Sequence, residues 1–247
     1  MALRRELLPL LLAAAFLLIG PAQALAAPTW LDGEGLDAFS NQGVPADVAA
    51  DAEGNAVAVW VGNGEVRAAY RPRGGEWGPP ENLDPGVPIV STQPRVTVQP
   101  DGEFVAVWGA QGAVEAPSPV RWARRPSGGG WSAPDTITFT SSFPAISALE
   151  AGGDGSVTVM ITDGDSVTTN RKAPGTETWG GDEGVPTGLG SRLAVGSDGS
   201  ALAAAQDTCG VSAAVACVRA TYRPPGGPWG APEDAGLAAV GNSITGH

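Results

Sequence analysis

Three tryptophans are the side chains with the clearest potential to bind a ligand. Trp60 and Trp108 each close an alternating apolar run, and Trp122 lies in the run VRWARRP. Further along the chain, Ile161 and Ala205 stand where Trp60 and Trp108 would recur. Indoles that differ from one part of the chain to the next could form a stacking platform for a sugar or a peptide. The alternative is that all three pack in the core.

Hydrolytic chemistry has few candidates. A Ser-His-Asp or Cys-His site needs a histidine as base, and the only histidine is His247. A pair of carboxylates acting on a glycosidic bond stays open, because the separation of Asp and Glu side chains cannot be read from sequence. The acidic turns at residues 154–156 and 163–166 lack the spacing and closing Glu of a calcium loop, so we interpret them as ordinary turns. No metal and no cofactor are expected.

The two cysteines, Cys209 and Cys217, bracket the segment GVSAAVA. In an exported chain, a close and isolated pair is most simply a disulfide that staples a long hairpin loop. The chain-entropy model gives such a short loop about 2 to 3 kcal/mol. A zinc site would need two more soft or imidazole ligands, which the sequence does not offer.

The elements that must position these residues recur four times. Each recurrence contains a Pro/Gly-rich segment such as RPPGGPW, with a tryptophan that follows its neighbour by 54, 48 or 50 residues. The anchor tryptophans are Trp77, Trp131, Trp179 and Trp229. The arginines that open the segments are Arg71, Arg125, Arg171 and Arg223. We expect each indole to pack between repeats, and each arginine to stack on it or to pair with a carboxylate such as Glu81 or Glu233.

A second signal precedes each hairpin. A turn glycine opens an alternating apolar run in every repeat, and further strand patterns lie on either side of that run, which gives four short strands per repeat. The turn glycines are Gly54, Gly102, Gly155 and Gly199. Four antiparallel strands at a period near 50 residues predict an all-β fold, a β-propeller with about four blades. A β-sandwich explains the short strands but not their regular recurrence.

The hairpin GG-x-W-[GS]-x-P, at residues 74–79, 129–134 and 226–232, resembles the tail of the Asp-box, or BNR, repeat of the sialidase-type β-propeller superfamily. That motif reads S-x-D-x-G-x-T-W, and its Asp is missing from all four hairpins here. A sialidase-like site implies an arginine triad, a Tyr-Glu nucleophile pair and an acid/base Asp. Tyr70 and Tyr222 each precede a recurring arginine, so they look structural. The arginines available for a triad are Arg67, Arg71, Arg95, Arg121, Arg125, Arg171, Arg192, Arg219 and Arg223.

The segment PTWLDGEGL resembles an isolated outermost strand, because Trp30 is followed six positions later by apolar Leu36, as in the four hairpins. We therefore predict a single propeller domain at residues 28–247, in which residues 28–43 form an N-terminal latch strand. The predicted blades are residues 44–90, 91–141, 142–188 and 189–238, and residues 239–247 begin a fifth unit. Such a latch normally completes a last blade, so the chain is expected to be truncated at its C-terminus; a four-bladed ring with ragged ends is the alternative.

Residues 1–27 have the pattern of a signal peptide, with Arg4 and Arg5, an apolar run and small residues at A-x-A spacing. The run is too short to span a membrane, so a secreted, extracellular protein is expected. The net charge of −12 and the single lysine, Lys172, make nucleic acid a poor partner.

These observations favour a non-catalytic binding or surface-interaction module, whose ligand is a glycan or an extracellular protein. One alternative is a secreted glycoside hydrolase of sialidase-like fold, with its site partly in missing blades. Another is a purely structural repeat in a larger surface protein.

Overall fold

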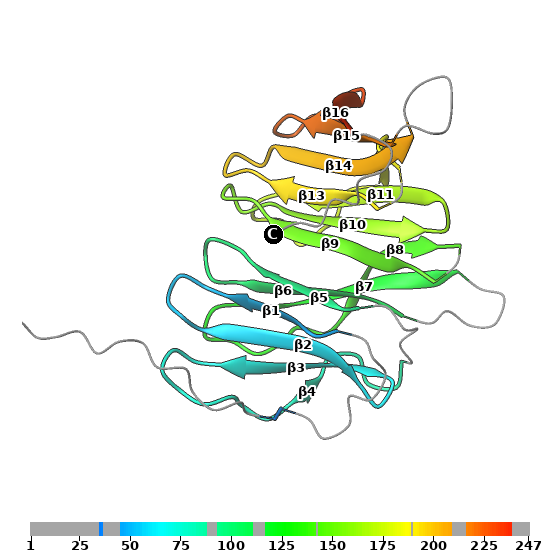
Figure 1. The fold of residues 1–247 in the computed structure, drawn as a ribbon. Coiled ribbons are helices and arrows are strands. Elements are labelled where there is room, and N and C mark those ends of the chain that lie inside the picture. The colour runs from blue at the N-terminus through cyan, green and yellow to red at the C-terminus, as the bar shows by residue number, and fades with distance from the viewer. Residues whose placement is uncertain are drawn as a thin grey trace, which may run out of the picture. The chain divides into compact units, whose positions relative to one another are not determined.

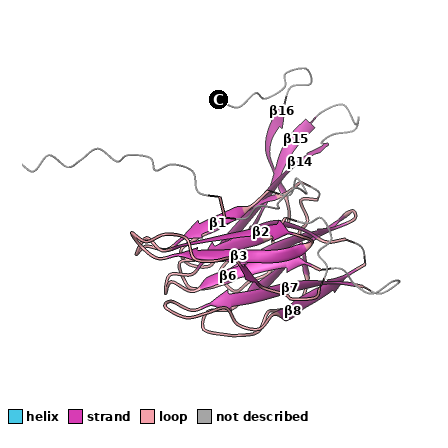
Figure 2. Cartoon of the chain, turned by 90° about the horizontal axis from the view of Figure 1, so that it is seen from below, coloured by secondary structure: helices cyan, strands magenta, loops and turns pink. Residues whose placement is uncertain are grey.

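A computed structural model describes residues 35–36, 45–87, 93–110, 117–141, 143–188, 190–208 and 216–238. The chain divides into two units, Met1–Gly35 and Leu36–His247. Gly35 is the only described residue of the first unit, so the fold presented here is that of the second. Strands, turns and loops make up its described part, and no helix there is long and apolar enough to cross a membrane (Figure 2).

Sixteen strands form four antiparallel sheets, each built from four consecutive strands (Figure 1). Blade 1 contains β1 (Asp47–Ala50), β2 (Ala56–Gly62), β3 (Glu65–Arg71) and β4 (Glu81–Asn82). Blade 2 contains β5 (Arg95–Val98), β6 (Phe104–Gly109), β7 (Ser118–Arg125) and β8 (Asp135–Thr140). Blade 3 contains β9 (Ala145–Ala151), β10 (Val157–Asp163), β11 (Ser166–Lys172) and β12 (Glu183–Gly184). Blade 4 contains β13 (Arg192–Val195), β14 (Ala201–Thr208), β15 (Ala216–Arg223) and β16 (Glu233–Ala238). The predicted propeller of four-stranded blades is confirmed.

The second strands of blades 1, 2 and 3 are largely buried on both faces, whereas β14 of blade 4 is buried on one face only. In β2, Val57, Val59 and Val61 point to one face of the sheet, and Ala58 and Trp60 point to the other. The three valines pack into one apolar cluster with blade 2. We call the side of a blade that faces the next blade in sequence its forward face, and the opposite side its rear face. The forward face of blade 1 therefore packs on the rear face of blade 2.

The same arrangement joins all successive blades. One cluster combines the forward face of blade 2 with the rear face of blade 3, and another combines blade 3 with blade 4. The first strands β1, β5, β9 and β13 are neighbours in that order. Among the described strands, none pairs with a strand of another blade, and the contacts between successive sheets include the three apolar clusters, whose burial favours assembly.

Turn chemistry fixes the connection between the first and second strands. The turn glycines have φ between 79° and 91°, a region that residues with a Cβ rarely adopt. At Gly102 a Cβ would also lie 3.4 Å from the Cβ of Ser127 in the other hairpin of the blade. The glycine that precedes every alternating run is therefore required by the backbone.

The hydrogen bonds of the hairpin between the third and fourth strands correct the predicted alignment of the recurring arginines in blade 3. The backbone N–H of the residue after each anchor tryptophan donates to a carbonyl on the third strand, at Tyr70, Arg124, Arg171 and Tyr222. The next residue on that strand is Arg71, Arg125, Lys172 or Arg223. Lys172, not Arg171, is therefore the blade 3 equivalent of the recurring arginine. The alignment shifted because the blade 3 hairpin has one more residue before its tryptophan than the other three.

Candidate functional site

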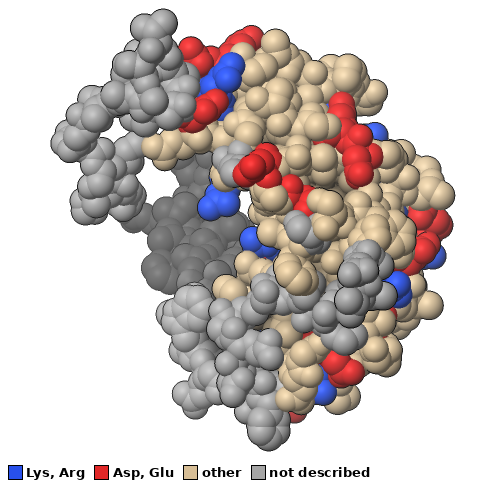
Figure 3. All heavy atoms as spheres, turned by 90° about the vertical axis from the view of Figure 1, so that its right-hand side faces the viewer, with Lys and Arg blue, Asp and Glu red and all other residues tan. Residues whose placement is uncertain are grey.

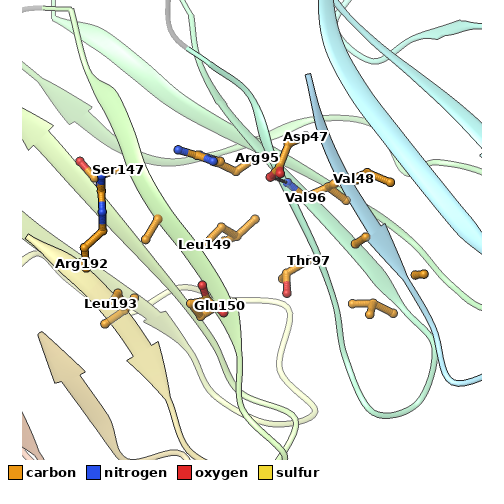
Figure 4. Close-up of a pocket in the computed structure, with 14 residues that line it drawn as sticks. Asp47, Val48, Arg95, Val96, Thr97, Ser147, Leu149, Glu150, Arg192 and Leu193 are labelled. Atoms are coloured by element: carbon orange, nitrogen blue, oxygen red, sulfur yellow. Dashed lines mark hydrogen bonds between the residues drawn. The ribbon is translucent and has the colours of Figure 1, made fainter. Parts of the chain in front are cut away.

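The first strands of all four blades line one cavity of about 630 Å³ (Figure 4). Its polar side chains come from four different blades. They are Asp47 of β1, Arg95 and Thr97 of β5, Ser147 and Glu150 of β9, and Arg192 of β13. A pocket of this size, with few convergent polar groups, has the usual dimensions of a small-ligand site.

The cavity residues occupy equivalent places but differ in chemistry. Seven residues before the turn glycine, the four blades carry Asp47, Arg95, Ala148 and Arg192. Two residues further along, they carry Ala49, Thr97, Glu150 and Ala194. A position that serves only packing keeps the same chemistry through the repeats, as the turn glycine does. The change of charge from blade to blade therefore indicates a site specific to this surface.

Backbone hydrogen bonds hold two of these side chains. Asp47 Oδ2 accepts a hydrogen bond of 3.0 Å from the backbone N–H of Val96, and Arg95 Nε donates one of 3.3 Å to the carbonyl of Ile146. Figure 4 shows Arg95 extending from β5 toward β9. Arg192 is exposed and, within the described residues, makes neither an ion pair nor a hydrogen bond. The terminal N–H groups of two guanidinium groups therefore stay available to a ligand.

Glu150 is the cavity residue with altered acidity. Burial raises the pKa of its carboxyl group above the usual range, and the negative charge of Asp47 raises it further, while Arg95 opposes both effects. Glu150 thus holds its proton to a higher pH than an exposed glutamate does. The site therefore combines carboxyl, hydroxyl and guanidinium groups.

The three tryptophans proposed as a stacking platform lie away from this cavity. Trp60, Trp108 and Trp122 are all at most 5% exposed. Trp108 Nε1 donates a hydrogen bond of 3.2 Å to Asp84 of blade 1, and the Trp122 ring contacts the edge of Trp179 of blade 3, with centroids 5.6 Å apart. Trp108 and Trp122 fill blade interfaces, and Trp60 packs beside Trp77 on the rear face of blade 1, so none of them presents a surface on which a ligand could stack.

The anchor tryptophans lie at the same interfaces. Trp131 packs against the cluster of blades 1 and 2, Trp179 against that of blades 2 and 3, and Trp229 against that of blades 3 and 4. Trp77 packs on the rear face of blade 1 beside Trp60. Trp30, the predicted anchor of the latch strand, lies outside the described residues, as do most of residues 28–43 and all of residues 239–247.

In blades 2, 3 and 4, the cation at the recurring hairpin position crosses the interface with the preceding blade. Arg125 of blade 2 lies over the Tyr70 ring at 4.1 Å and 3.8 Å from Glu81, both on blade 1. Lys172 Nζ lies 3.8 Å from Glu103 of blade 2. Each of these bridging cations therefore contacts a carboxylate of the preceding blade.

The recurring arginines of blades 4 and 1 differ from each other in whether they contact a preceding blade. Arg223 of blade 4 lies 3.6 Å from Glu183 of blade 3 and 5.2 Å from the centre of its own Trp229 ring, so it is the third bridging cation. Arg71 has no preceding blade in the described structure and donates to the carbonyl of Gly75 in its own hairpin. Arg171 pairs with Asp154 at 3.0 Å within blade 3.

The carboxylates of both acidic turns accept hydrogen bonds within the protein: Asp163 Oδ2 accepts from the N–H and hydroxyl of Ser141, and Asp154 accepts within its own turn. Asp154 Oδ1 accepts hydrogen bonds from the N–H and hydroxyl of Ser156. Burial acts to raise the pKa of Asp154, but these bonds and the charge of Arg171 outweigh it and lower the pKa. No group of three or more Asp, Glu, His or Cys side chains that could bind a metal occurs within the described ranges. Cys217 is buried, whereas Cys209 lies outside the described residues, so their disulfide stays a prediction.

Sequence reasoning counted Arg95 and Arg192 among the available arginines but did not single out Asp47, Glu150 or the site as a whole. A signal was present in the sequence. The position seven residues before each turn glycine changes from Asp to Arg to Ala to Arg, while the two residues directly beside it stay apolar or small. Comparing repeats for the place where their chemistry differs would have found the cavity.

No family model matches the sequence, and a comparison with curated proteins finds no match. Solved structures do resemble the chain. An α-L-arabinofuranosidase from Fusarium graminearum, in complex with an iminosugar inhibitor, has a TM-score of 0.50 and 9% identity over 73% of this chain and 61% of its own. A triple arginine-to-alanine mutant of AofleA from Arthrobotrys oligospora has a TM-score of 0.52 and 12% identity over 78% and 57%. The chain thus spans about six tenths of these structures. At such identities, the likeness supports the fold alone.

Proposed function

We propose that the protein is a secreted, non-catalytic module that binds a glycan in the cavity lined by the first strands of its blades. The observation that carries the proposal is the set of blade-specific polar groups around that cavity, above all Asp47, Arg95, Glu150 and Arg192. A sugar offers many hydroxyl groups at fixed angles, which such a mixture of donors and acceptors can satisfy. The α-L-arabinofuranosidase of similar fold, solved with an iminosugar inhibitor, is consistent with a carbohydrate ligand.

Export and the degenerate Asp-box relationship belong to the same proposal. Residues 1–27 carry the signal-peptide pattern, and the GG-x-W hairpins carry the resemblance. Intact mass of the protein recovered from culture medium tests export, since the cleaved chain should begin near Pro28. The same spectrum, taken before and after reduction with alkylation, tests the Cys209–Cys217 disulfide.

The binding test is calorimetric titration of the secreted protein with neutral and uronic-acid-bearing oligosaccharides. Arg192 is exposed and has no partner among the described residues. Arg192→Gln should weaken the binding of an oligosaccharide about tenfold or more, because a hydrogen bond to a charged group contributes about 1.5 to 3 kcal/mol. Arg73→Gln is the matched control, since Arg73 is an exposed hairpin arginine outside the cavity. Equal loss in both variants, or no binding to any sugar, contradicts the proposal.

One observation favours a second candidate, a glycoside hydrolase. Glu150 has a raised pKa in a cavity that also holds Asp47, and a protonated acid near an ionised carboxylate is the pairing that glycosidic cleavage uses. Release of product from aryl glycosides, abolished by Glu150→Gln, would establish this candidate. Saturable binding without product release supports the binding module instead.

A further inference from the structure

The forward face of blade 4 repeats the forward face of blade 1, but within the described structure no blade covers it. Strand register places three large side chains of blade 4 at the positions of three in blade 1. These are Leu202, Val218 and Tyr222, which correspond to Val57, Val66 and Tyr70. In blade 1 both valines are 0% exposed, whereas Leu202, Val218 and Tyr222 are 47%, 39% and 51% exposed.

Blade 1 shows what such a face binds. The rear face of blade 2 covers it with an apolar cluster, in which Phe104 meets the Tyr70 ring edge-on at 6.4 Å. The bridging cation Arg125 then lies over the Tyr70 ring, 3.8 Å from Glu81. A tyrosine ring and a carboxylate together thus form a socket for the guanidinium group of the next blade.

Blade 4 carries both parts of this socket. The carbonyl of Tyr222 accepts the same hairpin hydrogen bond as the carbonyl of Tyr70, so the two tyrosines are equivalent. Glu233 lies opposite Ala220, as Glu81 lies opposite Ala68, so the two glutamates are equivalent as well. Glu233 is exposed, and among the described residues it makes no ion pair. The sequence keeps the receiving groups although nothing in the described structure occupies them.

Blade 1 of the same chain does not fill the socket. Its repeat arginine, Arg71, donates to the carbonyl of Gly75, and Trp60 on its rear face is buried beside Trp77. Apart from Leu36, every residue of the apolar cluster on that rear face belongs to blade 1, so blade 4 contributes nothing to it. Both ends of the blade series are therefore open in the described structure.

We propose that the forward face of blade 4 is a docking surface for a further blade of the same repeat, which inserts an arginine between the Tyr222 ring and Glu233. Continuity with the three existing interfaces supports this occupant, because each of them joins a forward face to a rear face and is crossed by a bridging cation. Charge agrees as well, since Glu233, which makes no ion pair among the described residues, would face the incoming guanidinium group. This inference is independent of the proposed glycan site.

The test uses the only two tyrosines of the chain as paired reporters. Tetranitromethane should nitrate exposed Tyr222 of the full chain faster than Tyr70, which lies under Arg125. A second protein carries a copy of residues 91–141, blade 2, appended after His247; this copy contains no tyrosine. If the proposal holds, nitration of Tyr222 falls to the rate of Tyr70.

A matched control carries Phe104→Ser and Arg125→Gln in the appended copy only, and Tyr222 should then regain its reactivity. Persistent protection of Tyr70 in every protein shows that the original blades stay folded. Unchanged Tyr222 reactivity with the intact appended blade overturns the proposal, and so does equal protection by the control blade. The proposal also fails if sedimentation shows that the unextended chain dimerises and Tyr222→Arg returns it to a monomer, because the occupant is then a second copy.

Discussion

At the scale of single residues, the position of a charged side chain shows whether it joins two blades or lines the candidate site. The bridging cations Arg125, Lys172 and Arg223 lie at one repeated position and contact the preceding blade. Arg95 and Arg192 also lie at one repeated position, yet blades 1 and 3 carry Asp47 and Ala148 there. Composition could not distinguish these two groups, because arginine serves both. Only the register, which assigns each side chain to a face or to the cavity, separates them.

Glu150 should reduce stability at neutral pH. Its folded-state pKa lies above the unfolded value of about 4.3, so the stability linked to its proton is fully present below that value and is lost as the pH rises through the folded pKa. Glu150→Gln should therefore raise the urea midpoint at pH 7 and leave it unchanged near pH 3.5. Glu76→Gln, at an exposed position of the blade 1 hairpin outside the cavity, serves as the comparison. A midpoint lowered at pH 7 would show that ionised Glu150 is stabilised rather than strained.

At the scale of elements, the strands and their order could be predicted because two periodic signals coincide. The turn glycine with its alternating run and the hairpin tryptophan together mark each four-stranded blade. Trp60, Trp108 and Trp122 show the limit of that approach. Their irregular recurrence left a ligand platform open beside core packing, the favoured interpretation, and the choice depends on which face of which strand each indole occupies. Burial decided it: the adjacent blade covers Trp108 and Trp122, and Trp77 of the same blade packs beside Trp60.

Trp179 should be the hairpin residue on which the interface of blades 2 and 3 depends. Trp179→Ala removes its contacts with that cluster and with the Trp122 ring, so we expect a loss of about 2 kcal/mol or more in the free energy of unfolding. Trp179→Phe should cost much less, because it keeps a ring and removes an indole N–H that is buried without a partner. Phe139→Ala, at a 62% exposed position, should stay within about 0.5 kcal/mol. Urea unfolding compares the three; equal losses would contradict this role.

At the scale of the whole molecule, the second unit of the chain is a series of nearest-neighbour contacts. Blades 2 and 3 are covered on both faces, whereas blade 4 is covered only on its rear face. The number of covered faces could not be read from sequence, since all four blades carry similar alternating runs. It follows from where each blade stands in the series.

Amide hydrogen exchange should reflect this order. We expect β6 and β10 to exchange slowest and β14 and β15 to exchange fastest among the described second and third strands, because a sheet with one open face loses less burial when it opens. Peptide-level mass spectrometry of the full chain measures the series. Uniform exchange across the four blades would instead indicate a single cooperative unit.

Lys172 gives the molecule an unusual chemical property. It is the only lysine of the chain, and it is 2% exposed at the interface of blades 2 and 3, with its Nζ 3.8 Å from Glu103. An amine-directed acylating reagent should therefore couple to the native protein at the α-amino group alone, in a one-to-one ratio. Acylation of Lys172 would then require those two blades to separate. The rate of its acylation therefore measures how often this interface opens.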